Sequence, residues 1–312
     1  MNGLTIAGPS PLGYGPRQWV YVTRRFQSLA TSLALPRDTL DDAETKARGV
    51  IKSLNRAFRG ESTFDNYVLG GSWGKGTAIH PPTDIDLYFI LPDEILFQFD
   101  AYAGNKQSRL LNYVKGELAK TYSQTDIRQD GQVVVVGFNS ITVEVVPSFH
   151  RSDRGLTICD TNDGGRWKQV DPEAEKGVLD RSDKALCGNH RKLARIFKQW
   201  KRHCHVPVKS FHIERLIGEA LPLLNWGRRN EFWFDWIVRD SFAYLAERAG
   251  GDFSMPGNPC ERISLDDAWG SKAESAYRRA HKACEYERDN RNTCAGIEWR
   301  KIFGTAVPET VT

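Results

Sequence analysis

The sequence has few of the features that are typical of disulfide-bonded, membrane-spanning or nucleic-acid-binding proteins. Its six cysteines are scattered, and no two of them stand in a C-x-x-C spacing, so reduced thiols are expected. No stretch approaches the roughly 20 apolar residues that a membrane helix needs. Lys and Arg total 43 against 39 acidic residues, and this excess is too small to indicate a nucleic-acid binder by itself.

The N-terminal residues are also not expected to be a secretory signal. Residues 1–15 have neither a basic start nor an apolar run, so they do not form a secretory signal. Their Gly and Pro content is typical of a loose tail. These absences predict a soluble, cytoplasmic protein that has no membrane partner.

The chain does have the composition and length of an ordinary globular protein with two packed regions. It has 312 residues, of which 40% are hydrophobic and 26% charged. Periodicity and turn signals predict an α/β half followed by a helical half, with a boundary near residue 180. The predicted helices are 16–34, 39–58, 104–121, 183–203, 211–224, 231–248 and 271–288, and the predicted strands are 67–69, 85–91, 132–138 and 141–146.

A glycine-rich turn follows the first predicted strand. Gly70, Gly71 and Ser72 precede a segment that can open a helix. Glycines let a backbone approach a phosphate closely, and Ser72 can cap the helix or donate to a phosphate oxygen. Lys75 is a further phosphate candidate, although its spacing does not match the G-x-x-x-x-G-K-[ST] pattern. Most Gly-Ser turns hold no ligand, so this signal is weak when it stands alone.

Two carboxylates then stand two residues apart on a predicted strand. Because side chains alternate along a strand, Asp84 and Asp86 share one face, and Ile85, Leu87, Phe89 and Leu91 share the other. Adjacent carboxylates repel each other, and a hard cation such as Mg²⁺ relieves that repulsion. The simpler alternative is an exposed strand face that carries two solvated acids.

A third acid lies on a later strand. Glu144 interrupts the apolar run Thr-Val-Glu-Val-Val, where Val143 and Val145 face the other way. A carboxylate in so apolar a run is costly when it is buried without a partner. Three acids that share two metal ions form the arrangement used for in-line phosphoryl or nucleotidyl transfer.

Basic residues recur on the predicted helix 183–203. Arg191, Arg195, Lys198 and Arg202 form a stripe beside an apolar face. A solvated helix face, a triphosphate site and a nucleic-acid surface all remain open for this stripe.

These motifs together resemble a known superfamily. A Gly-Ser turn, a strand-borne D-x-D and an acid on a later strand are similar to the polymerase-beta-like nucleotidyltransferases. G-S-W-G-K-G-T-A-I, D-I-D-L-Y and V-E-V-V-P-S-F more narrowly resemble the cyclic-oligonucleotide synthases of bacterial anti-phage defence, which are relatives of cyclic GMP-AMP synthase and oligoadenylate synthetase. Weaker matches lie at 160–168 and 208–214, and the resemblance spans about residues 16–250.

The resemblance implies a fold and a set of roles. The fold would be α+β, with a mixed-sheet nucleotidyltransferase core and a helical N-terminal spine over 1–180, and an α-helical lobe over 181–312 that closes the active-site cleft. Asp84, Asp86 and Glu144 would be catalytic and would bind two Mg²⁺ or Mn²⁺ ions. The nucleotide-binding residues would be Gly71, Ser72, Lys198 and Ser210.

The implied activity is synthesis of a cyclic di- or trinucleotide second messenger in anti-phage (CBASS) signalling. The substrates would be ATP, with GTP or a pyrimidine triphosphate as partner, and a separate effector would sense the product. An RNA or protein activator is a further expected partner. Two alternatives are a template-independent enzyme that extends RNA or makes linear oligoadenylate, and a nucleotide sensor that does not turn over. The sensor would lack a carboxylate, and none is missing.

Overall fold

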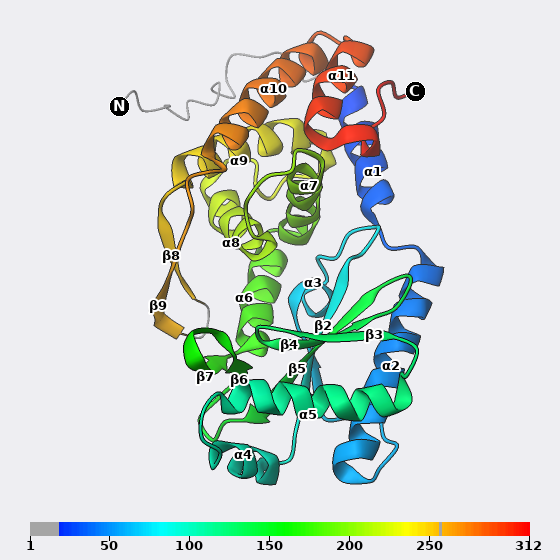
Figure 1. Cartoon of the computed structure of the whole chain (residues 1–312). Coiled ribbons are helices and arrows are strands. Elements are labelled where there is room, and N and C mark those ends of the chain that lie inside the picture. Colours follow the sequence, from blue (N-terminus) through cyan, green and yellow to red (C-terminus); the bar gives the residue numbers. More distant parts are fainter. Residues whose placement is uncertain (1–18, 256–257) are drawn as a thin grey trace. The chain divides into compact units, whose positions relative to one another are not determined.

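The computed structural model describes residues 19–255 and 258–312, which form two compact units. One unit comprises residues 35–178, and the other joins residues 19–34 to residues 179–312 (Figure 1). The predicted tail over 1–15 lies outside the described residues. The boundary after residue 178 falls inside one helix, α6 (Pro172–Ala185). The fold is α+β with a mixed sheet, as the sequence predicted.

The first unit is built on a seven-stranded sheet. Five of the strands lie side by side in the order β1-β2-β5-β4-β3. Strand β6 pairs with both β5 and β7. Strands β2 and β5 run parallel, and the remaining pairs are antiparallel. The strands are β1 (Tyr67–Leu69), β2 (Asp84–Ile90), β3 (Asp126–Asp130), β4 (Val133–Gly137), β5 (Thr142–His150), β6 (Leu156–Asp160) and β7 (Arg166–Val170). The helices are α2 (Arg37–Arg59), α3 (Gly71–Gly74), α4 (Asp93–Asp100), α5 (Lys106–Thr121) and the start of α6.

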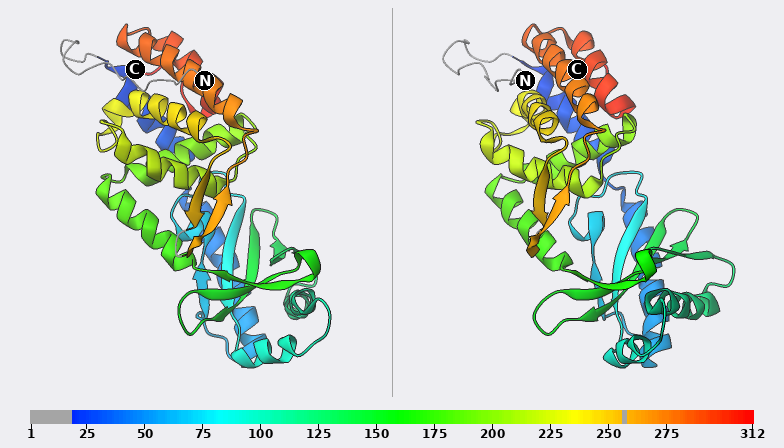
Figure 2. Two further views of the ribbon diagram at one scale, coloured as in Figure 1. Left: turned by 90° about the vertical axis from the view of Figure 1, so that its left-hand side faces the viewer. Right: turned by 60° about the vertical axis from the view of Figure 1, so that its left-hand side comes forward.

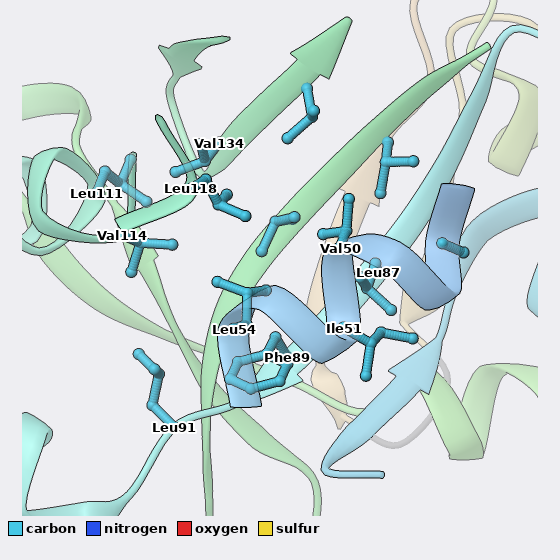
Figure 3. Packing of buried hydrophobic residues seen from close by; sticks show 14 of the residues in the cluster. Val50, Ile51, Leu54, Leu87, Phe89, Leu91, Leu111, Val114, Leu118 and Val134 are labelled. Carbon is cyan, nitrogen blue, oxygen red and sulfur yellow. The ribbon is translucent and has the colours of Figure 1, made fainter. Parts of the chain in front are cut away.

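One face of this sheet carries the core. The apolar alternation along β2 is confirmed, since Ile85, Leu87 and Phe89 are almost completely buried. Helix α2 covers them with residues at helical spacing, among them Val50, Ile51 and Leu54 (Figure 3). The helix ends at Arg59, one residue beyond the predicted end at 58, and the next residue, Gly60, has the left-handed conformation (φ +71°) that ends many helices.

The opposite face of the sheet is acidic at one end of the strands and apolar at the other. On β2, Asp84 and Asp86 come first, and Tyr88 and Ile90 follow them. Ile90 belongs to a small apolar cluster with Val146 of β5, and Tyr88 packs against that cluster. A hydrophobic anchor at one end of this face therefore fixes the strands that carry the carboxylates at the other end.

The second unit is mainly helical. Helix α1 buries Phe26 in edge-to-face contact with Phe234 and Trp299, so α1 lies with this unit, whereas the sequence prediction counted it with residues 1–180. Strands β8 (Asp252–Met255) and β9 (Asn258–Ser264) form a separate two-stranded ribbon (Figure 2). The helices are α1 (Tyr21–Leu33), α7 (Asn189–His203), α8 (Ser210–Ala220), α9 (Phe234–Arg248), α10 (Gly270–Arg288) and α11 (Asn292–Phe303).

None of the helices over 19–255 and 258–312 is both long and apolar enough to cross a membrane. Cys159, Cys187, Cys204, Cys284 and Cys294 are free thiols.

Candidate active site

The strand register brings the three predicted carboxylates to one face of the sheet. Asp86 of β2 is paired directly with Glu144 of the parallel strand β5, and Asp84 lies two residues before Asp86 on the same face. All three side chains are partly exposed, whereas Ile85, Val143 and Val145 between them are buried. The carboxylates therefore contribute little to the core.

The charge on this face affects Glu144. Burial, with the negative charges of Asp84, Asp86 and Asp130, raises the pKa of Glu144 to about 7, and Arg128 opposes this effect. Ionisation of Glu144 is thus disfavoured by the other two predicted metal ligands.

Hard divalent cations suit this set of oxygen donors. Mg²⁺ prefers carboxylate oxygens, and a cation among these side chains would neutralise the charge repulsion that, after burial, contributes to the raised pKa of Glu144. In the part of the chain that the structure describes, no group of three or more His, Cys, Asp and Glu side chains has the geometry to hold a metal ion as it stands. The position of the three carboxylates on one face of the sheet, and their negative charge, fit a divalent cation.

The glycine turn lies directly beside Asp86. The Gly70 N–H donates to the Asp86 carbonyl at 2.9 Å. Gly71 has a φ of +50°, and a Cβ on it would lie 1.6 Å from Asp86 Oδ2, so only glycine permits this approach. The Ser72 carbonyl accepts from the N–H groups of Thr77 and Ala78, which closes the turn. Gly70 and Gly71 therefore lie directly against Asp86.

Gly71→Ala should reduce turnover about 100-fold, because the new methyl group displaces the Asp86 carboxylate by an ångström or more. The matched control is Gly104→Ala: Gly104 has a φ of +77° and nothing within 4 Å of its Cβ position. Both substitutions place a Cβ on a backbone in the left-handed conformation, but only the Cβ in Gly71→Ala collides with a carboxylate. Steady-state kinetics of the two proteins check this, and equal activity would contradict the contact.

The predicted triphosphate ligands Lys198 and Ser210 lie in the helical unit. Lys198 is buried on α7, and its Nζ donates to Glu214 Oε1 of α8 at 2.5 Å. Ser210 is the first residue of α8, and its hydroxyl accepts from Lys201 Nζ at 3.2 Å. Their roles towards a nucleotide remain predictions.

The basic stripe on α7 is partly neutralised. Arg191 pairs with Asp180 and also with Asp183, the latter at 2.9 Å. Burial lowers the pKa of Arg195 and that of Arg202. A surface that binds a nucleic-acid backbone needs exposed cations, so these contacts favour a structural role for Arg191.

Sequence reasoning missed two residues near the turn. Tyr88 follows Asp86 on the same strand face, and burial, with the charges of Glu175 and Asp86, raises the pKa of its phenol. Glu175 of α6 lies 3.6 Å from Lys75 Nζ. The alternation along β2 was a usable signal for Tyr88, whereas Glu175 lies in a segment for which the sequence predicted neither helix nor strand.

Solved structures share this fold. *Escherichia coli* MS115-1 CdnC, in its complex with HORMA-deltaN, superposes with a TM-score of 0.68 and 18% identity over 90% of this chain and 96% of that chain. The *Vibrio cholerae* DncV cyclic AMP-GMP synthase, in complex with the linear intermediate 5′ pppA(3′,5′)pG, gives a TM-score of 0.64 and 13% identity over 92% and 86%. A curated relative, the CBASS oligonucleotide cyclase CdnC of *Escherichia coli* (strain KTE188), is 24% identical over 224 residues, 69% of either chain.

The fold is shared with these structures, and the class of protein follows from a family match. The Second Messenger Oligonucleotide or Dinucleotide Synthetase domain matches residues 21–182, and the chain belongs to this family. The protein is accordingly a metal-dependent enzyme that makes a nucleotide second messenger from nucleotide substrates. The resemblance found in the motifs is confirmed.

Proposed function

We propose that this enzyme makes a cyclic di- or trinucleotide from nucleoside triphosphates and acts in bacterial anti-phage signalling. The observation that carries the proposal is the parallel register of Asp86 with Glu144, beside the Gly71–Ser72 turn. The relatives named as CBASS oligonucleotide cyclase and as cyclic AMP-GMP synthase support the cyclic product.

Asp84, Asp86 and Glu144 would hold two Mg²⁺ or Mn²⁺ ions. Bound there, the ions supply charge neutralisation for a triphosphate and lower the pKa of an attacking hydroxyl. The Gly71–Ser72 turn would receive the triphosphate through its backbone N–H groups and the Ser72 hydroxyl. Lys198 and Ser210 are proposed as further phosphate contacts, which for Lys198 requires release from Glu214.

The proposed substrates are ATP, with GTP or a pyrimidine triphosphate as the second base. A separate effector would sense the product in the cytoplasm. A protein activator is supported by the complex of CdnC with HORMA-deltaN, and an RNA activator is the alternative. Extension of RNA or synthesis of linear oligoadenylate has less support, because Arg191 of the basic stripe is paired with acids.

Incubation of the protein with each pair of labelled nucleoside triphosphates, in Mg²⁺ or Mn²⁺, tests the proposal. The products are treated with phosphatase and identified by mass. A phosphatase-resistant cyclic species, absent with Asp84→Asn/Asp86→Asn protein, is the expected result and names the bases. Linear or RNA-linked product alone would contradict the cyclic assignment.

A further inference from the structure

Lys75 is a buried lysine at the end of the α3 turn. Its side chain is only 7% exposed, and its backbone N–H donates to the Gly71 carbonyl at 3.2 Å. Its Nζ lies 3.6 Å from Oε2 of Glu175, which is itself largely buried near the start of α6. A desolvated ammonium needs a compensating negative charge, and Glu175 supplies one.

The same turn is held from its other end by Tyr88. A Cβ on Gly70 would lie 2.3 Å from Tyr88 Cε2, so the backbone of the turn rests on the phenol ring. Glu175 is close enough to Tyr88 for its charge to oppose ionisation of the phenol. Lys75, Glu175 and Tyr88 therefore surround the turn that carries Gly71 and Ser72.

We propose that Lys75 and Glu175 are a positioning pair. Their ion pair ties the α3 turn to α6, and this tie keeps Gly71 against Asp86 and fixes where Ser72 is presented. Lys75 then acts through the turn and is not itself a triphosphate ligand. The inference rests on the proposed function, because it assigns the pair a role in the same site.

The two roles for Lys75 predict different kinetics. A lysine that contacts the triphosphate in the ground state contributes to binding, so its loss raises KM, and Glu175 matters little. A positioning pair fixes the alignment of the reacting groups, so the loss of either partner lowers kcat. Because the two residues act as a unit, their effects do not add.

The test compares Lys75→Met, Glu175→Gln and the double variant. Each single change should lower kcat about 10- to 100-fold with KM for ATP changed less than about threefold. The double variant should be no worse than the worse single one. Lys75→Arg, which keeps the charge, should retain most activity. Lys120→Met and Glu117→Gln, from an ion pair on α5 whose Lys120 is 71% exposed, are the matched controls and should match the unsubstituted enzyme.

Hydrogen exchange of peptides spanning residues 70–78 gives a readout that needs no turnover. Both single variants should exchange faster there than the unsubstituted protein, at a temperature at which each variant is fully folded. The double variant, which leaves neither charge of the pair, serves if a single variant does not fold. A raised KM in Lys75→Met, with normal kinetics in Glu175→Gln, would overturn the positioning role, and so would unchanged exchange in both variants. If the unsubstituted protein makes no product, the proposed function fails, and exchange alone then decides whether the tie exists.

Discussion

The double variant Asp84→Asn/Asp86→Asn should fold normally and make no nucleotide product. Both side chains lie on the face opposite the core and are partly exposed, so the change removes metal ligands without opening a cavity. A loss of at least about 1,000-fold in kcat is expected, which corresponds to roughly 4 kcal/mol of transition-state stabilisation. Product formation, measured with thermal unfolding of the same samples, checks both halves of the expectation.

The stability of that variant should equal or exceed that of the unsubstituted protein. Asp84 and Asp86 both raise the pKa of Glu144, so their neutralisation relieves a repulsion between like charges. The control Asp93→Asn/Asp126→Asn changes two exposed carboxylates of the same unit and should leave kcat unaltered. Normal turnover by a well-folded Asp84→Asn/Asp86→Asn protein would remove these residues from the active site.

Arg25→Ala should destabilise the helical unit by about 3–5 kcal/mol. Arg25 is 1% exposed, and its Nε donates to the buried Glu287 carboxylate at 2.7 Å. Its two terminal nitrogens donate to the carbonyls of Pro308, Glu309 and Asn292 and to the Asn292 side chain. The substitution leaves Glu287 buried without its guanidinium and removes the donors that hold the C-terminal segment.

Urea unfolding measures this effect against a surface pair. Arg48 donates to Glu44 at 2.8 Å on an exposed face of α2, and Arg48→Ala should cost less than about 1 kcal/mol. If the two substitutions lower the free energy of unfolding by similar amounts, the expected contribution of the buried Arg25–Glu287 pair is wrong.

The sequence predicted the site residues best where the alternation of side chains along a strand determines the face on which each one lies. The period of two placed Asp84 and Asp86 opposite Ile85 and Leu87, and the same rule placed Glu144 opposite Val143, because only one face of each strand meets the core. The predicted helix end at 58 lies one residue from the end of α2 at Arg59, because Gly60 there adopts the left-handed conformation that suits glycine.

Other elements had no readable pattern. Strand β3, Asp-Ile-Arg-Gln-Asp, is polar because it pairs only with β4, and the sequence prediction contained no strand there. The segment 150–180, for which the sequence predicted neither helix nor strand, contains β6 and β7, whose turn is held by Asp160, Asn162 and Arg166 side chains. The place of α1 depends on long-range contacts such as Arg25 with Glu287, which local periodicity does not encode.

The parallel register of β2 and β5 also links catalysis to the course of folding. Strands β3, β4 and β5 follow one another and pair by short connections, whereas β2 and β5 are far apart in the chain and must close a long loop. Contacts of that kind tend to form late. In a partly folded chain in which β3, β4 and β5 are paired but β2 has not yet joined them, Glu144 lies without Asp84 or Asp86 beside it. Incompletely folded molecules are therefore catalytically silent, and a slip of one residue between β2 and β5 would bury Glu144 or expose the core.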